Sequence, residues 1–226
     1  MVVSSTQPLA GFSIGLSGAV PERKHWTEPA MDRAILEFVA SFSATVFQKG
    51  GRLVHGSHPA FTPVIARQAR LHGRQGERQL ALVVSELWPA TLEDYRRLGL
   101  TAWVDIISCP KVGAGDEKDA QTRNASLSAM RRRLIEELDL IVAVGGKLHD
   151  ATPFNPGITE ELELAAKASI PALIVGSHGG MAAQAANNPL QGRGVIDIIN
   201  TTDISHCVYQ VYKTILGHLQ PDPDTD

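Results

Sequence analysis

The chain has 226 residues, a net charge of −3, 43% hydrophobic residues and 20% charged residues, which suits a globular domain with its own core. These values exclude a polycationic surface, so we expect no general nucleic-acid binding. No apolar stretch approaches the roughly 20 residues that span a bilayer, and the N-terminus lacks a secretory pattern. We expect a cytoplasmic protein without a membrane segment, in which Cys109 and Cys207 are free core residues.

The first half of the chain alternates short apolar runs with amphipathic stretches. Four apolar runs predict strands, at residues 12–18, 52–56, 80–86 and 102–110. The helical periodicity predicts helices between them, at residues 27–49, from Pro59 onward, and at 91–99. Thr27 is the expected cap of the first helix, and Pro59 is the expected start of the second.

The segment 119–140 predicts a long helix with one arginine on its apolar face. Its apolar stripe consists of four residues, Leu127, Met130, Leu134 and Leu138. Arg131 falls inside this stripe, whereas Arg132 and Arg133 point away. A core-facing arginine needs an acid or an anionic ligand, because burying it unpaired costs several kcal/mol. The alternative is a surface arginine that extends from the edge of the stripe to solvent.

Residues 139–165 combine a strand, a glycine turn and a helix N-terminus, which is the arrangement of an anion site in α/β proteins. The apolar run ends at Gly145 and Gly146, and Gly157 opens the helix. Glu161 lies beside the apolar face of this helix, whereas Glu160 and Glu163 are predicted to face outward. Acids in a first helical turn are also favoured by the helix dipole alone, so a purely stabilising role for Glu161 stays open.

The remaining segments complete an α/β pattern. A sixth strand ends at Gly176 and Ser177, Gly179 and Gly180 open another helix, and 203–219 forms a last amphipathic helix. We expect a Rossmann-like, doubly wound, mainly parallel sheet of six or seven strands in one domain. The expected division is an N-terminal extension (1–11), the domain (12–219) and a disordered tail (220–226).

Four of the predicted strand ends carry glycine turns, and parallel strands bring such ends to one edge of the sheet, where ligands bind. We therefore expect a phosphate-bearing ligand there. The predicted binding residues come from these turns and the two helices: Ser17, Gly18, Gly56, Ser57, His58, Arg131, Gly145, Gly146, Lys147, Glu161, Gly176, Ser177, Gly179 and Gly180. Neither a Walker A loop nor a GxGxxG fingerprint is present.

Four histidines fall in the same predicted turns, namely His55, His58, His149 and His178. They could converge as metal ligands, but no HxH or HxxxH pair with a nearby acid occurs, and histidine also bonds phosphate without metal. We expect no metal and no cofactor. His58 is the histidine expected to contact the ligand, because its turn opens a helix.

Five sequence motifs, spread over residues 12 to about 185, carry a resemblance to a known group: SGAVPE, GGRLVHGSHPAFTPVI, MRRRLIEELDLIVAVGGK, GITEELELA and VGSHGG. The chain resembles the SLOG superfamily, the Rossmann-like group of the LOG nucleotide phosphoribohydrolases, the DNA-processing protein Smf/DprA, and sensor domains of TRPM channels and Thoeris anti-phage effectors. In the LOG enzymes, a helix arginine and the glutamate of a PGGxGTxxE motif act on an N-glycosidic bond. The resemblance implies Arg131 and Glu161 as the catalytic pair of an enzyme.

The sequence also departs from the LOG motif, because the proline is missing, Ile158 replaces the threonine, and ten residues separate Gly146 from Gly157. This split arrangement looks more like the sensor members, which bind NAD-derived messengers such as ADP-ribose and cyclic ADP-ribose isomers. The resemblance then implies that Lys147 meets a phosphate and Glu161 a ribose hydroxyl pair. A LOG-like N-glycosidic hydrolase and a nucleoside deoxyribosyltransferase-like enzyme are the alternatives. A sensor would need an effector protein partner, and we expect a homo-oligomer.

Overall fold

The computed structural model describes residues 7–148, 157–188 and 194–219, and these form one parallel sheet with helices on both faces. Its seven strands are β1 (Ser13–Ala19), β2 (Arg52–His55), β3 (Leu80–Ser85), β4 (Asp105–Cys109), β5 (Leu140–Gly145), β6 (Ala172–Val175) and β7 (Val195–Ile199). The expected tail at 220–226, most of the expected N-terminal extension and His149 lie outside the described residues.

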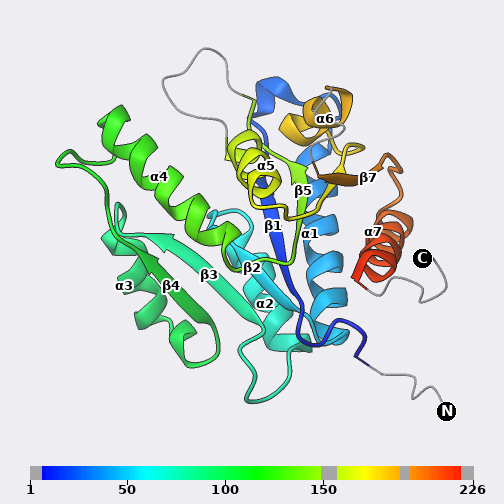
Figure 1. Ribbon diagram of the computed structural model, residues 1–226, viewed down its shortest axis with the longest axis horizontal. Helices are drawn as coiled ribbons and strands as arrows, with labels where there is room; N and C mark the ends of the chain where they lie inside the picture. Colours follow the sequence, from blue (N-terminus) through cyan, green and yellow to red (C-terminus); the bar gives the residue numbers. More distant parts are fainter. Residues whose placement is uncertain (1–6, 149–156, 189–193, 220–226) are drawn as a thin grey trace.

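The helices divide into two layers. On one face lie α1 (Met31–Gln48), α2 (Thr62–His72), α3 (Pro89–Arg97) and α7 (Ile204–Leu219), whose apolar residues belong to one core cluster. The other face carries α4 (Ala120–Ile135), α5 (Gly157–Lys167) and α6 (Gly180–Asn187). Two 3-10 turns, η1 (Arg23–His25) and η2 (Leu100–Ala102), complete the described elements. Figure 1 shows α4 and α5 in front of the sheet and α1 and α2 behind it.

The order in which the strands are added to the sheet reverses at β1. The strand order is β4-β3-β2-β1-β5-β6-β7, so the chain winds outward from β1 to β4 and then returns through α4 to β5 on the other side of β1. In the register, Leu16 of β1 faces His55 of β2 and Val142 of β5. Helices on opposite faces follow from the common right-handed crossover of the two halves. The carboxyl end of β1 is therefore the switch point where such sheets bind ligands.

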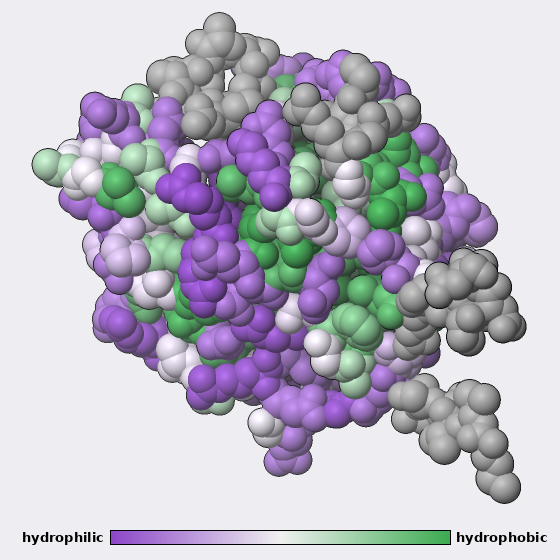
Figure 2. Space-filling view, viewed as in Figure 1, coloured by the Kyte–Doolittle hydropathy of each residue, from purple (hydrophilic) through white to green (hydrophobic). Residues whose placement is uncertain are grey.

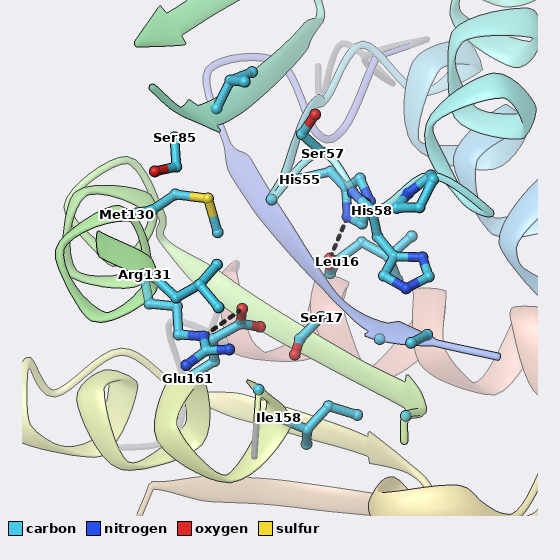
Figure 3. Close-up of a pocket in the computed structure, with 18 of the residues that line it drawn as sticks. Leu16, Ser17, His55, Ser57, His58, Ser85, Met130, Arg131, Ile158 and Glu161 are labelled. Atoms are coloured by element: carbon cyan, nitrogen blue, oxygen red, sulfur yellow. Dashed lines mark hydrogen bonds and ion pairs between the residues drawn. The ribbon is translucent and has the colours of Figure 1, made fainter. Parts of the chain in front are cut away.

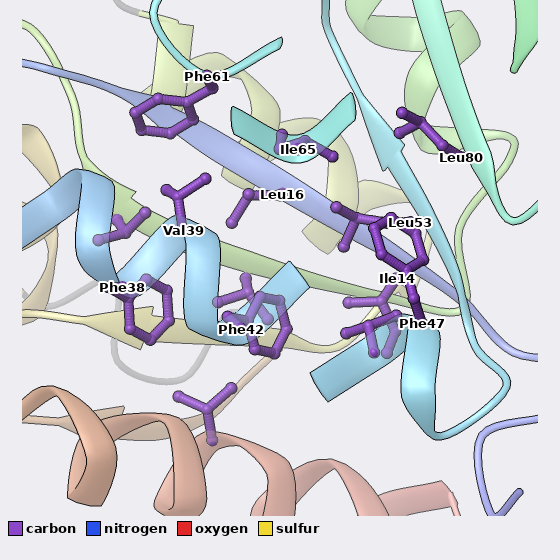
Figure 4. Close-up of a cluster of buried hydrophobic side chains, with 14 of the residues drawn as sticks. Ile14, Leu16, Phe38, Val39, Phe42, Phe47, Leu53, Phe61, Ile65 and Leu80 are labelled. Carbon is purple, nitrogen blue, oxygen red and sulfur yellow. The ribbon is translucent and has the colours of Figure 1, made fainter. Parts of the chain in front are cut away.

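The largest core lies between the sheet and α1. Phe38, Phe42 and Phe47 of α1 pack with Ile14 and Leu16 of β1, and all five side chains are fully buried or nearly so. Figure 4 shows these rings facing the strands, with residues of α2 beside them. Ile35, Phe38, Phe42 and Val46 are spaced by three or four residues, so one stripe of α1 faces the sheet along its whole length. This core fixes β1, which in turn places the switch point.

The α/β class and the six predicted strands are confirmed. The seventh strand, β7, lies in a segment that the sequence analysis left unassigned, because Asp197 interrupts its apolar run and the strand sits half-buried at the sheet edge. Two helix starts were wrong. Helix α1 begins at Met31, four residues after Thr27, and α2 begins at Thr62 rather than at Pro59, with a proline in its first turn.

The surface of the α4–α5 face is largely hydrophilic, with hydrophobic residues visible between the polar ones near its middle (Figure 2). Among the described residues, none of the helices combines the length and the apolar character needed to cross a membrane. Cys109 and Cys207 are both free and buried, as predicted. Burial raises the pKa of the Cys207 thiol to about 12, so it stays protonated in the core.

Candidate functional site

A cavity of about 480 Å³ opens at the carboxyl ends of β1, β2, β3 and β5, which is within the usual range for small-molecule sites. Its walls come from the β1 and β2 ends, from α3 and α4, and from the start of α5. Figure 3 shows Arg131, Glu161 and Ser17 gathered on one side of it and Ser57 and Ser85 on another. Nine of the predicted binding residues line the cavity: Ser17, Gly18, Gly56, Ser57, His58, Arg131, Gly146, Lys147 and Glu161.

Arg131 is buried on α4 and faces α5, as the apolar stripe predicted, whereas Arg132 is exposed. Its guanidinium pairs with two acids of α5: NH1 contacts Glu160, and Nε lies 3.8 Å from Glu161 Oε1. Burial raises the pKa of Glu161 above its usual value, and the positive charge of Arg131 opposes that rise. The site thus holds a buried, partly neutralised carboxylate against a fixed cation.

The prediction that Glu160 faces outward was wrong. The side chain of Glu160 is only 18% exposed and forms an ion pair with Arg131. The helical wheel placed Glu160 correctly relative to its own helix, but it ignored α4, which packs against α5 and brings the guanidinium to that flank. A long buried arginine reaches an acid that the pattern of one helix places in solvent.

Ser17 faces the acids because β1 alternates its side chains between the two faces of the sheet. Ile14 and Leu16 point into the α1 core, so Ser17 points toward α5. Its hydroxyl is buried and, within the described part of the chain, has no hydrogen-bond partner; the same holds for Arg131 Nε. Buried polar atoms without hydrogen-bond partners are rare and costly, so these two atoms are the candidate contacts for a polar ligand on this wall of the cavity.

His55 builds the turn rather than binding in the cavity. Its Nδ1–H donates to the Leu16 carbonyl (2.9 Å), and its Nε2 accepts from the His58 backbone N–H (3.1 Å). Both ring nitrogens are therefore used by the neutral imidazole, and burial lowers its pKa to about 4. Between these histidines, Ser57 takes the left-handed conformation (φ 59°), which non-glycine residues seldom adopt.

His58 presents a neutral ring to the cavity. Its Nδ1 accepts from the Ala60 N–H (3.3 Å), which leaves Nε2–H as the donor. Burial, with smaller contributions from the nearby His55 and Lys147, lowers the pKa of His58 to about 4. At neutral pH, His58 can donate a hydrogen bond to a phosphate or hydroxyl without adding charge.

The sequence analysis missed the α3 side of the cavity. Trp88, Thr91 and Tyr95 line it, together with Arg123 of α4 and Ser85 at the end of β3. The Arg123 guanidinium carbon lies 5.7 Å from the centre of the Trp88 ring, and the Ser57 and Tyr95 hydroxyls are 2.6 Å apart. The sequence analysis selected strand ends that carry a glycine turn, and β3 has no glycine at its end, so this part of the site was not predicted. The aromatic residues at the start of the next helix were the available signal.

Five predicted residues do not line the cavity, namely Gly145, Gly176, Ser177, Gly179 and Gly180, and Gly145 shares a turn with the cavity-lining Gly146. Gly145 and Gly146 both have positive φ, and the Gly146 N–H donates to the Ala19 carbonyl (2.6 Å), so this amide is not available to an anion. Gly180 packs directly on that turn, where any side chain would overlap the Gly145 and Gly146 backbone. Gly176, Ser177 and Gly179 lie further toward β6 and α6. Ligand binding by these five outer residues stays a prediction.

His178 lies outside the cavity and packs on Phe38 of the main core, with ring centres 6.0 Å apart. Among the described residues, His, Cys, Asp and Glu form no group of three or more that could hold a metal ion. Burial lowers the pKa of His178, which keeps it a neutral core residue. His55 and His58 thus form hydrogen bonds in their turn, and His178 packs in the core.

Comparison with protein-family models assigns nearly the whole described chain to one family. The model described as SLOG cluster2 matches residues 10–217. The chain belongs to the SLOG cluster2 family. This confirms the SLOG resemblance seen in the glycine turns and supports a nucleotide-related function, either binding or LOG-like activity.

Other comparisons bear on the fold of this SLOG protein. The X-ray structure of TM1055, a Northeast Structural Genomics Consortium target, is similar with a TM-score of 0.54 at 11% identity, over 89% of this chain and 98% of that one. At this identity the likeness concerns the fold alone. A search of curated proteins gave no match. The SLOG assignment therefore rests on the family model.

Proposed function

We propose that this SLOG domain binds a nucleotide derived from NAD or ADP-ribose, as a sensor or sequestering domain, in the cavity at the end of β1. One observation carries the proposal: the buried Ser17 hydroxyl and Arg131 Nε have no hydrogen-bond partner within the described residues, and both residues line a cavity of ligand size. A polar ligand that bonds both atoms removes the cost of their burial.

The geometry suggests a division of the ligand between two groups of residues. The carboxylate of Glu161 can accept hydrogen bonds from two ribose hydroxyls, with Ser17 beside it. Lys147 is exposed at the cavity mouth, next to the start of α5, where backbone N–H groups and the helix dipole favour an anion. We place the phosphate between Lys147 and this helix start, in the cavity that His58 also lines.

Ile158, in the first turn of α5, favours binding without cleavage. Ile158 lines the cavity at the position of the threonine in the LOG motif, and its side chain fills the space beside Gly146. An isoleucine offers no hydroxyl to a phosphate, so the ligand is held by fewer donors than that motif provides. Loosely positioned groups bind well but hold a reacting bond poorly.

N-glycosidic hydrolysis is the second candidate, because the pKa of Glu161 is raised by burial beside a fixed cation. A carboxyl group with a raised pKa in a cleft suits general acid or base chemistry. In that reaction, Glu161 would activate water or stabilise positive charge at the ribosyl carbon, while the base leaves.

One experiment separates the two functions. The pure protein is incubated with AMP, NAD, ADP-ribose and cyclic ADP-ribose isomers, and its melting temperature and the chromatographic fate of the ligand are followed together. A melting shift that grows as RT ln(1 + [L]/Kd), with the ligand intact, supports the binding domain. The shift should fall in Glu161→Gln and persist in Glu163→Gln, because Glu163 does not line the cavity.

Two results would contradict the proposal. Release of free base by the wild type, lost in Glu161→Gln, would establish the hydrolase instead. Absence of any shift with all of these nucleotides would remove the nucleotide ligand from the cavity altogether.

A further inference from the structure

The cavity has two chemically different ends. Arg131, Glu161 and Lys147 supply charge at the end beside β5 and α5. The end beside α3 is built instead from Trp88, Thr91 and Tyr95, with Leu127 and Arg123 of α4 facing them. We call these five residues the α3 end. Ser57, which follows β2, and Ser85, at the end of β3, also line the cavity (Figure 3).

The α3 end has the composition of a stacking platform with hydrogen-bonding groups at its edge. The Trp88 ring is partly buried and carries the Arg123 guanidinium over its face at 5.7 Å. A planar ring can stack on tryptophan or arginine, and the Tyr95, Ser57, Thr91 and Ser85 hydroxyls can donate or accept at the ring edge. Together with the proposed ribose position at Glu161, this places a base-sized compartment next to the sugar.

The charge at the α3 end restricts which base fits. Arg123 is the one charged side chain among its five residues. A neutral base gains from stacking near the guanidinium, whereas a cationic pyridinium ring, such as that of nicotinamide in NAD, is repelled by it.

We infer that the α3 end is the subsite for a neutral planar base, stacked against the Trp88–Arg123 pair, and that it disfavours a cationic nicotinamide ring. This inference rests on the proposed nucleotide function and specifies it further. The base would lie between α3 and α4, the ribose at Glu161 and the phosphate toward Lys147.

The test measures how much the base contributes to affinity and whether Trp88 carries that contribution. Calorimetric titrations of the full chain use AMP, nicotinamide mononucleotide, which has the cationic ring, and ribose 5-phosphate, which has no base. We expect AMP to bind wild type about tenfold more tightly than ribose 5-phosphate, because stacking on an aromatic ring supplies this order of affinity. Nicotinamide mononucleotide should bind no more tightly than ribose 5-phosphate.

Two substitutions at Trp88 then test the stacking. Trp88→Leu should abolish the difference between AMP and ribose 5-phosphate, whereas Trp88→Phe should keep most of it. Fluorescence gives an independent reading, with Trp26 as the matched control: its ring also carries an arginine, Arg23, at 5.4 Å, but it does not line the cavity. Quenching of tryptophan emission by AMP should be lost in Trp88→Phe and kept in Trp26→Phe.

The outcomes test the base subsite and the proposed nucleotide binding separately. If nucleotides bind wild type but Trp88→Leu weakens AMP and ribose 5-phosphate equally, Trp88 is structural and the subsite is wrong. Tighter binding of nicotinamide mononucleotide than of AMP would overturn the choice of a neutral base. If AMP, NAD and ADP-ribose all fail to bind wild type, the proposed function fails first and the subsite with it.

Discussion

Arg131 on α4 and Glu160 on α5 form an ion pair in which the side chains are only 8% and 18% exposed. The pair joins the crossover helix that returns the chain to β5 with the helix that follows β5. Glu161 lies on the other side of the same guanidinium, so one cation offsets two acids. The stability of this corner and the chemistry of the cavity therefore depend on one residue.

Removing Arg131 should destabilise the fold as well as weaken binding. Arg131→Ala leaves two buried carboxylates without their cation, and breaking such a pair costs about 3 kcal/mol or more of the free energy of unfolding. Arg132→Ala is the control, because Arg132 is exposed on the next position of α4, and it should change stability by about 0.5 kcal/mol or less. Urea denaturation measures both; equal losses in the two variants would mean that the buried pair contributes nothing.

Stability should fall as the pH drops from about 6.5 toward 4, partly because of His55. Its pKa is about 4 when folded and near 6.5 when unfolded, so the unfolded state binds the proton first and gains as the pH falls. The full contribution is about 3 kcal/mol, lost by pH 4. Glu161 has a raised folded pKa and acts in the opposite direction, because its contribution is lost as the pH rises.

The contribution of His55 is isolated by comparing variants. His55→Asn cannot titrate, so its unfolding free energy should depend less on pH between 6.5 and 4 than that of wild type. His218→Asn, at an exposed position of α7, should keep the wild-type dependence. A His55→Asn profile parallel to wild type would show that other groups cause the acid sensitivity.

A side chain at Gly146 should be poorly tolerated. The residue has φ +93°, and a Cβ there would overlap Ile158 and approach Met181 Cβ to 3.1 Å. We expect Gly146→Ala to cost about 2 kcal/mol of stability. Gly217→Ala provides the contrast, because nothing lies within 4 Å of a Cβ there and alanine favours α7, so it should stabilise by about 0.5–1 kcal/mol. Thermal denaturation compares the two; a neutral Gly146→Ala would mean that the turn can move.

If Lys147 meets a phosphate at the cavity mouth, nucleotide affinity should depend on ionic strength. Lys147 is exposed, so its attraction to the phosphate is screened by salt. Lys147→Ala should weaken AMP binding about threefold at low salt and reduce the salt dependence, whereas Lys167→Ala, at the far end of α5, should do neither. An unchanged salt dependence in Lys147→Ala would place the phosphate elsewhere.

The fold was predictable because the signals for it are local. Apolar runs and 3.6-residue periodicity lie in contiguous stretches, and they gave six strands with the helices between them. Helix starts were less accurate, since the start of α1 uses no side-chain cap and the sequence offered Thr27 instead. The edge strand β7 was missed because a half-buried strand that contains an aspartate lacks a continuous apolar run.

The cavity was predictable where one element carried enough information. The stripe of α4 identified Arg131 as buried, and the flank of α5 identified Glu161. Glu160 was misplaced because its partner lies on another helix, and Trp88 was missed because its place on the cavity wall depends on the tertiary arrangement of α3 and α4. The hydrogen bond from the Gly146 N–H to the Ala19 carbonyl could not be predicted from the sequence pattern either, because it depends on the pairing of β1 with β5.

The switch at β1 means that the chain passes the cavity several times, each time with a different βα unit. A chain break in the loop between β4 and α4 would leave Ser17, Ser57 and Trp88 on one fragment and Arg131 and Glu161 on the other. Neither fragment would contain a site, and ligand binding would return only when the two fragments associate. The cavity thus lies between the two halves of one sheet, and a ligand bound in it would contact both halves.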